Sequence, residues 1–176
     1  MNYEGQICRG PMERSSYMLP VAVGCSYNRC KFCTLFRHLK YRELPMEQIE
    51  AELERVRSLG GNPKHVFLGD GNAFGLATKR LLEITDLIHR YFPGCQAINM
   101  DGTITNIQAK SREELLALRK AGIYHLYLGI ESGLDDVLRY MGKDHNLDQA
   151  YRQIDRIQRA GFIFDAHIKI GRASCR

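Results

Sequence analysis

The sequence predicts an α/β protein built on a parallel sheet, because short apolar runs alternate with amphipathic segments along most of its 176 residues. A unit of helix, glycine and strand recurs at Gly60, Gly94, Gly122 and Gly161. Short connections of this kind imply right-handed crossovers between parallel strands. Two arrangements remain open, a barrel-like sheet and a doubly wound sheet, and ligands bind at the carboxyl ends of the strands in both.

In the first half of the chain, two amphipathic segments separate apolar strands. Residues 18–23 form a continuous apolar run, which is typical of a buried strand. Pro45 suits a first helical position, and apolar residues follow at helical spacing until Gly60 stops the helix. Thr78 can cap the second helix, which Pro93 and the glycine after it terminate.

The second half repeats the pattern. Ser111 and Glu114 form a capping box for a third helix that ends at Gly122. Two further helical patterns cover residues 134–141 and 147–160. The strands expected from this scheme are residues 18–23, 65–68, 96–100, 125–130 and 162–169, which gives about five βα units.

The composition is that of an ordinary soluble domain, with 44% hydrophobic and 26% charged residues. No run approaches the roughly 20 apolar residues of a membrane span, and residues 1–14 are polar and lack the apolar stretch of a signal peptide. We therefore expect one cytoplasmic domain without a membrane partner. Six cysteines, three of them bunched, favour a metal in a reducing compartment over a disulfide framework. Cys8 and Cys95 are expected to be ordinary thiols.

The three bunched thiols are Cys25, Cys30 and Cys33. A closed zinc site needs four ligands, whereas an iron-sulfur cluster held by three cysteines keeps one iron free for a ligand. His38 could complete a zinc site. The spacing also opens a ferredoxin loop, but the next cysteine, Cys95, is distant. The residues alone leave an open cluster, a zinc-stabilised binding module and a plain electron carrier as alternatives.

Polar and glycine residues follow each of the first four expected strands. The thiols follow the first strand, Gly69-Asp70-Gly71-Asn72 the second, Asp101-Gly102 the third and Glu131-Ser132-Gly133 the fourth. Any one of these groups could be a turn or cap. Since all lie at one edge of a parallel sheet, we expect them to surround a common ligand site.

Positive charge is concentrated around the thiols in a chain of net charge +5. Such a run is often only a solvated face, but it can also favour a phosphate-bearing or nucleic-acid substrate. The residues concerned are Arg29, Lys31, Arg37, His38, Lys40 and Arg42. His65, His125 and His167 lie in or beside apolar strands and are expected to belong to the core, with His167 the best candidate for a site residue among them; Tyr127 is expected to serve packing.

Three segments together resemble the radical S-adenosylmethionine (radical SAM) superfamily. They are CSYNRCKFC at residues 25–33, GDGN at residues 69–72 and LGIESGLDDVLRYMGKDHN at residues 128–146. More narrowly, they are similar to uncharacterised iron-sulfur oxidoreductases related to methylthiotransferases and oxygen-independent coproporphyrinogen oxidase. The resemblance covers residues 17–169 and implies a partial (βα) barrel.

The resemblance implies a role for individual residues. Cys25, Cys30 and Cys33 would hold a [4Fe-4S] cluster whose fourth iron chelates S-adenosylmethionine, although this loop has one residue more between its first two cysteines than the commonest loop of the superfamily. Phe32 would lie near the adenine, and Lys143 would meet the methionine carboxylate. The residues implied at the methionine amino group and the ribose are Gly69, Asp70, Gly71, Asn72, Glu131 and Ser132, with Asp101 a looser candidate.

The implied activity is reductive cleavage of S-adenosylmethionine to methionine and a 5′-deoxyadenosyl radical, which abstracts hydrogen from a substrate that the sequence does not identify. A reductant such as flavodoxin or ferredoxin is implied as a partner. We expect residues 1–16 to be an N-terminal extension and residues 17–169 an incomplete barrel core, truncated before a sixth strand. Residues 170–176 break the pattern and read like a translated sequencing adapter, so a non-native tail is expected.

Overall fold

The computed structural model describes residue 4 and residues 8–170 of the chain. Its elements are the 3-10 helix η1 (Pro11–Glu13), β1 (Tyr17–Pro20), β2 (Ala22–Val23), β3 (Arg42–Glu43), α1 (Met46–Ser58), β4 (His65–Gly69), the 3-10 helix η2 (Ala73–Gly75), α2 (Thr78–Tyr91), β5 (Ala97–Gly102), α3 (Ile104–Gln108), α4 (Arg112–Lys120), β6 (Ile123–Glu131), α5 (Asp135–Met141), α6 (Leu147–Arg159) and β7 (Ile163–Ile168).

Five strands form one parallel sheet in the order β1-β4-β5-β6-β7. The order in space is the order in sequence, so the sheet winds in one direction only. A doubly wound sheet reverses its strand order at a switch point, and this sheet does not. The structure therefore confirms the α/β class and decides for the partial barrel.

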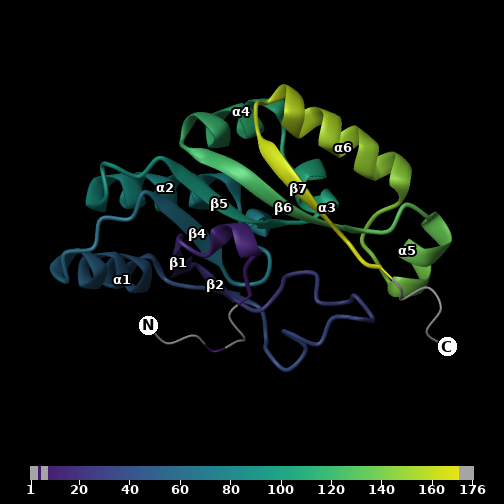
Figure 1. Ribbon diagram of the computed structural model, residues 1–176, viewed down its shortest axis with the longest axis horizontal. Coiled ribbons are helices and arrows are strands. Elements are labelled where there is room, and N and C mark those ends of the chain that lie inside the picture. The colour runs from purple at the N-terminus through teal and green to yellow at the C-terminus, as the bar shows by residue number, and fades with distance from the viewer. Residues whose placement is uncertain (1–3, 5–7, 171–176) are drawn as a thin grey trace.

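Helices α1, α2, α4 and α6 cover the outer side of the curved sheet, and η1 lies on the opposite, inner side (Figure 1). Alternate strand residues face the two sides. Leu19, Leu68 and Leu126 belong to the large apolar core shared with the helices, whereas Phe67 and Tyr127 belong to a small separate cluster on the inner side. The inner side is therefore where polar groups can gather.

Several predicted boundaries are confirmed. Ser111 caps α4 in a capping box with Glu114, and their side chains and backbone N–H groups bond reciprocally. Helix α5 ends at Gly142, whose φ of 68° is a left-handed conformation that suits glycine. The Ser111 capping box works through neighbouring residues, which explains why the sequence alone indicates it.

The first expected strand, residues 18–23, is wrong as a single element. It divides at Val21, whose backbone N–H donates to the Gly69 oxygen at 2.5 Å and whose carbonyl accepts from the Leu44 N–H at 3.0 Å. Pro20 ends β1 because it has no N–H to continue the ladder. Residues Ala22–Val23 then turn away and pair antiparallel with β3.

Three helix starts also differ from expectation. Pro45 is not the first residue of α1 but the cap before it, because its ψ of 148° is not helical. Helix α3 was not expected, because five residues are too few for an apolar period to be read; Thr103 and Asn106 cap it. Thr78 is not the cap of α2 but its first residue, after Ala77. None of the described helices is both long enough and apolar enough to cross a membrane. Apart from Ile170, the expected tail lies outside the described residues.

Candidate functional site

A cleft of about 440 Å³ opens at the carboxyl ends of the strands. This volume lies in the range of small-molecule sites. Its walls come from the N-terminal segment, the cysteine-bearing loop, the ends of β5 and β6, and the end of β7. The lining residues are Cys8, Arg9, Gly10, Pro11, Cys25, Phe32, Cys33, Leu35, Phe36, Gly71, Asp101, Gly102, Tyr127, Gly129, Glu131, His167, Ile168 and Lys169.

The cysteine loop, which we define as residues 24–41, is held together by its own polar groups. The Asn28 side-chain amide donates to the Phe36 oxygen at 2.9 Å. The Arg37 guanidinium donates to the carbonyls of Cys33 at 2.8 Å and Cys30 at 3.0 Å. The Cys33 N–H also donates to the Cys30 oxygen at 3.1 Å. The backbone around two of the three thiols is thus fixed from within the loop.

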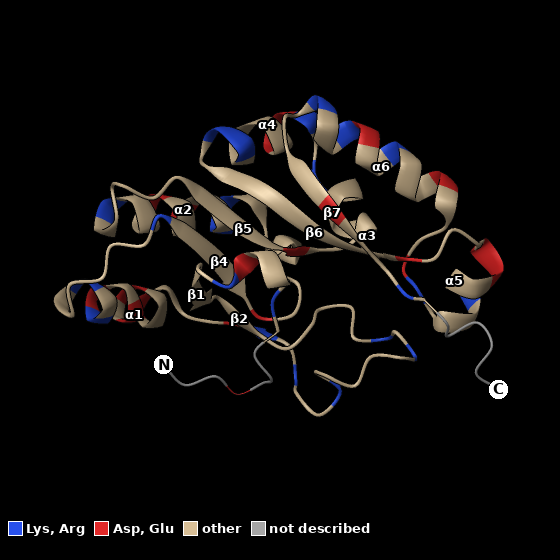
Figure 2. Cartoon of the chain, viewed as in Figure 1, with Lys and Arg blue, Asp and Glu red and all other residues tan. Residues whose placement is uncertain are grey.

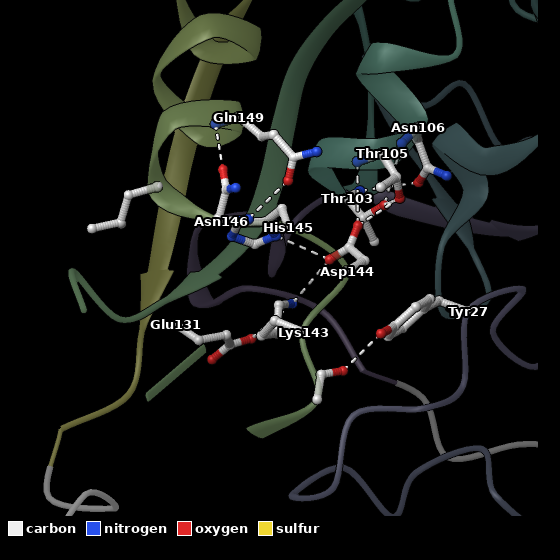
Figure 3. A network of polar contacts seen from close by, with 12 residues as sticks. Tyr27, Thr103, Thr105, Asn106, Glu131, Lys143, Asp144, His145, Asn146 and Gln149 are labelled. Carbon is white, nitrogen blue, oxygen red and sulfur yellow. Dashed lines mark hydrogen bonds and ion pairs between the residues drawn. The ribbon is translucent and has the colours of Figure 1, made fainter. Parts of the chain in front are cut away.

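The loop is also fastened to the end of α5. The Lys31 N–H donates to the Met141 oxygen at 2.8 Å, and the Tyr27 hydroxyl donates to the Gly142 oxygen at 2.7 Å (Figure 3). A Cβ at Gly142 would lie 3.2 Å from the Arg29 oxygen, so the two backbones touch there. The turn after α5 therefore positions the loop that carries the thiols.

The three thiols are close enough to influence one another. Burial raises the pKa of Cys30, the charges of Cys25 and Cys33 raise it further, and Lys143 opposes the rise. Within the described residues, no three His, Cys, Asp or Glu side chains converge as ligands of a single ion must. A [4Fe-4S] cluster spreads its thiolates over separate irons, so three cysteines on one loop fit it. His38 is exposed, and the zinc site finds no support.

The Gly69–Asn72 segment packs directly against the start of the cysteine loop. Gly71 has a φ of 41°, and a Cβ there would lie 2.6 Å from the Gly24 oxygen. The Asn72 amide donates to the Ser26 hydroxyl at 3.1 Å. Asp70 is buried, and burial raises its pKa to about 6. Glycine is needed at residue 71 because two backbones meet there.

Asp101 lies at the end of β5 and faces the cleft. Burial, with a smaller effect from the Glu13 charge, raises its pKa to about 7. Glu13 comes from η1 and accepts hydrogen bonds from Tyr127 and Asn99, both at 2.7 Å, and from Ser16. This buried carboxylate anchors the N-terminal segment on the inner side of the sheet.

Glu131 and Lys143 come together although twelve positions separate them in the sequence. The Lys143 Nζ lies 3.9 Å from the Glu131 Oε1 and 3.8 Å from the Asp144 Oδ1 (Figure 3). Glu131 adopts a φ of 70° at the end of β6, which is unusual for a residue with a side chain. A Cβ at Gly129 would lie 3.2 Å from the Lys143 Nζ, so glycine there leaves room for the ammonium.

The structure brings half of the sequence-predicted site residues to the cleft. Those that line it are Cys25, Phe32, Cys33, Gly71, Asp101 and Glu131. Gly69, Asp70 and Asn72 lie behind Gly71, Lys143 lies behind Glu131, and Cys30 is near Lys143. The Ser132 hydroxyl accepts from the Leu134 N–H at 3.2 Å, so it takes part in the turn before α5.

Sequence reasoning missed several residues at the cleft. Lys169 places its ammonium 4.5 Å from the centre of the Phe32 ring. Tyr127, expected only to pack, lines the cleft beside His167, 5.9 Å away between ring centres. Cys8, expected to be an ordinary thiol, lines the cleft too. Strand alternation could have indicated Tyr127, but no local signal marks Cys8 or Lys169. His167, the histidine that the sequence favours for the site, does line the cleft. The expectation that His65 and His167 belong to the core is wrong, because both are exposed.

Positive charge covers the cysteine loop without opposing acids. Residues 14–42 contain no Asp or Glu, and blue but no red marks the loop in Figure 2. Arg29, Lys31, Arg37 and Lys40 are all exposed. The expected basic surface is therefore present next to the cleft.

Comparisons with known proteins agree with this geometry. The profile described as radical SAM superfamily matches residues 19–170. Heme chaperone HemW of Bacillus subtilis (strain 168) is 25% identical over 140 residues, which cover 78% of this chain and 36% of HemW. Threonylcarbamoyladenosine tRNA methylthiotransferase MtaB of Thermotoga maritima is 25% identical over 154 residues, which cover 83% of this chain and 34% of MtaB. The chain spans about a third of the length of these relatives.

Solved structures share the fold at lower identity. The cobalamin-dependent enzyme OxsB, with S-adenosylmethionine bound, has a TM-score of 0.71 at 18% identity over 87% of this chain and 23% of its own. Coproporphyrinogen III oxidase (HemN) from Escherichia coli has a TM-score of 0.66 at 14% identity over 87% of this chain and 36% of its own. TsrM from Kitasatospora setae, of the same fold, was solved with a [4Fe-4S] cluster.

S-adenosylmethionine and a [4Fe-4S] cluster are the two cofactors that the sequence resemblance implies, and both are bound in proteins of this fold. The strand order independently excludes the doubly wound alternative. The profile match over residues 19–170, together with this sheet, shows that the chain belongs to the radical SAM superfamily.

Proposed function

We propose that residues 17–169 form the cofactor-binding core of a radical SAM enzyme, in which Cys25, Cys30 and Cys33 hold a [4Fe-4S] cluster. The observation that carries the proposal is the cysteine loop itself. Two of its three thiols, Cys25 and Cys33, line the cleft. Its backbone is fixed by Arg37 and by the turn after α5. Such a loop suits a cluster with one open iron.

The second cofactor, S-adenosylmethionine, would occupy the cleft between this loop and the rim of the sheet. Gly71 lets the rim approach the start of the cysteine loop closely, and the Gly69–Asn72 segment is proposed to meet the methionine amino group. Glu131 is proposed to accept from the ribose, with Ser132 next to it, and Lys143 to meet the carboxylate. Phe32 and Asp101 complete the walls.

When bound, the cluster and S-adenosylmethionine supply a reductive cleavage that yields 5′-deoxyadenosyl and methionine, and hydrogen is then taken from a substrate. The chain's own residues bind, orient and shield the cofactors. Asp101, Tyr127 and His167 line the inner side of the cleft, and the exposed His167 is proposed to contact that substrate. A one-electron donor such as flavodoxin or ferredoxin is proposed as the partner that reduces the cluster.

A phosphate-bearing or nucleic-acid substrate is favoured by one specific observation, the acid-free basic loop beside the cleft. MtaB, by its name, acts on a tRNA. Lysine and arginine bind phosphate with a strong salt dependence. Binding of a short RNA that weakens steeply as salt rises, and that is lost when Arg29 and Lys40 are changed to glutamine, would support this substrate class. Equal binding by the double variant would exclude the loop as the contact.

The function itself is tested by anaerobic reconstitution with iron and sulfide. The wild-type chain should bind about four irons and, with dithionite, release 5′-deoxyadenosine from S-adenosylmethionine. Cys30→Ala should lose both, because the cluster loses one of its three ligands. Cys95→Ala, at the half-buried thiol before β5, is the matched control and should retain both. A wild-type protein that takes up zinc but no iron would contradict the proposal.

A further inference from the structure

The Asp144 carboxylate accepts three hydrogen bonds from neighbouring residues. Its Oδ2 accepts from the Thr105 hydroxyl at 2.6 Å and the Thr105 N–H at 3.2 Å, and its Oδ1 accepts from the His145 Nδ1 at 3.0 Å (Figure 3). The side chain of Asp144 is 2% exposed and that of His145 is 0% exposed. Helix α3, through Thr105, and the neighbouring residue His145 therefore fix the orientation of this carboxylate.

The same contacts keep Asp144 charged. Burial alone would raise its pKa, but the hydrogen bonds from His145 and Thr105 and the charge of Lys143 outweigh burial and lower the pKa. A buried carboxylate stays ionised only when such partners surround it. The structure thus maintains a fixed negative charge beside the Lys143 ammonium.

The Lys143 ammonium lies between two carboxylates but donates no hydrogen bond to either of them. Its side chain is 4% exposed, and the two carboxylate oxygens nearest to Nζ, on Glu131 and Asp144, lie at 3.9 and 3.8 Å. Both distances exceed a hydrogen bond, and no hydrogen bond from Nζ is formed in the part of the chain that the structure describes. An ammonium has three donors, and burying them unpaired is costly. This geometry suits an incoming acceptor.

The acceptor can arrive from the cleft. Gly129 and Glu131 both line the cleft, and the Lys143 Nζ lies directly behind them, 3.2 Å from where a Cβ at Gly129 would be. Asp144 lies on the other side, bonded to Thr105 of α3. The charge of Asp144 can therefore orient Lys143 toward the cleft without touching a ligand itself.

From this arrangement we infer that Asp144 is a positioning residue, which with Thr105 and His145 holds the Lys143 ammonium for the carboxylate of S-adenosylmethionine. The inference rests on the proposed function, in which Lys143 meets that carboxylate. It adds a carboxylate, a hydroxyl and an imidazole that contact no cofactor but set the geometry of the residue that does.

A purely structural role is the competing explanation. Asp144 also ties the turn after α5 to α3, and that turn supports the cysteine loop through Gly142. On that explanation, changing Asp144 lowers stability and cluster content, and any loss of S-adenosylmethionine binding does not depend on Lys143. A double-mutant cycle separates the two, because only residues that act through each other are non-additive.

The test is equilibrium binding of S-adenosylmethionine to anaerobically reconstituted protein by calorimetry, with cluster content and melting temperature measured on the same samples. Asp144→Asn should raise the dissociation constant about ten-fold or more, since it removes a buried charge that orients the ammonium. Lys143→Gln should raise it as well, and the double variant should bind no more weakly than Lys143→Gln. Thr105→Val should weaken binding, and Thr105→Ser, which keeps the hydroxyl, should restore it.

Asp135→Asn is the matched control. The Asp135 carboxylate lies in the same segment and accepts from the Leu147 N–H at 2.7 Å, away from Lys143. Asp135→Asn should bind S-adenosylmethionine with the same dissociation constant as the wild type. Wild-type affinity in Asp144→Asn, or effects of Asp144→Asn and Lys143→Gln that add, would overturn the inference while leaving the proposed function intact. Should Asp144→Asn not fold, the cycle of Thr105→Val with Lys143→Gln decides, because effects that add would overturn the inference and effects that do not add would support it. Failure of the wild-type protein to bind S-adenosylmethionine would overturn both.

Discussion

Gly71 packs so closely against Gly24 that a Cβ at residue 71 would lie 2.6 Å from the Gly24 carbonyl oxygen. The contact joins the rim after β4 to the first residue of the cysteine loop. Both glycines have positive φ, 41° and 78°. Two segments that bear different parts of the proposed cofactor site are thus in backbone contact, and a side chain at this point would force them apart.

Gly71→Ala should therefore damage both stability and cluster binding. We expect the free energy of unfolding to fall by about 1–3 kcal/mol, the usual cost of strain at such a backbone position, and iron content to fall with it. Gly133→Ala is the control, because nothing lies within 4 Å of a Cβ there. Urea denaturation of the apo-protein and iron analysis after reconstitution measure the two effects. Equal behaviour of both variants would show that the contact is not tight.

The exposed Arg37 guanidinium donates hydrogen bonds to the backbone of two of the proposed cluster ligands. Arg37→Gln removes hydrogen bonds to the carbonyls of Cys30 and Cys33 and a positive charge beside the cluster. Because the reduced cluster is the more negative form, its reduction potential should fall. Arg29→Gln removes an exposed charge from the same loop and should shift the potential less. Redox titration followed by electron paramagnetic resonance compares them, and equal shifts would refute a special role for Arg37.

Glu13 should contribute strongly to stability although it lies in the N-terminal segment. Glu13→Ala leaves the hydroxyl of Tyr127 and the amide of Asn99 without their acceptor. Unpaired buried donors cost about 1–3 kcal/mol, and urea denaturation should show a loss of that size. Glu54→Ala removes only an exposed pair with Arg57 and should change stability by less than about 1 kcal/mol. A loss for Glu13→Ala as small as that for Glu54→Ala would contradict this account.

The raised pKa of Asp101 predicts that the stability of the protein depends on pH. Its folded pKa is raised to about 7 by burial and by Glu13, above the ordinary value of 3.8. Between these values the folded state binds more protons than the unfolded state, so this group makes stability fall as pH rises from about 4 to 7. The stability of Asp101→Asn should therefore fall less steeply with pH than that of the wild type. Asp70, with a pKa raised to about 6, should account for the decrease that remains. Denaturant midpoints of the apo-protein from pH 4.5 to 7.5 measure it; identical profiles for wild type and Asp101→Asn would exclude the shift.

Local signals made much of the fold predictable. Helix α4 follows from its capping box and from Gly122, and the five parallel strands follow from short apolar runs between helical patterns. The break at Val21 was not predictable, because it depends on bonds to Gly69 and Leu44, which are distant in sequence. Helix α3 was too short to show a period.

The site was predictable where chemistry is concentrated in one segment, as in the cysteine loop. The site was not predictable where its contacts join residues that are distant in the sequence. Asp144 is an ordinary acidic residue in sequence, and only its bond to Thr105 gives it importance. The bond between Glu13 and Tyr127 joins residues 114 positions apart. Such pairs follow from the way the strands assemble into the curved sheet, which no local pattern encodes.

The central claim, that three cysteines leave one iron open for S-adenosylmethionine, is tested most directly by electron paramagnetic resonance. The reduced, reconstituted protein should give a [4Fe-4S] signal that changes when S-adenosylmethionine is added. A signal that stays the same at saturating S-adenosylmethionine would show that the cluster has no open iron, and the account would be contradicted.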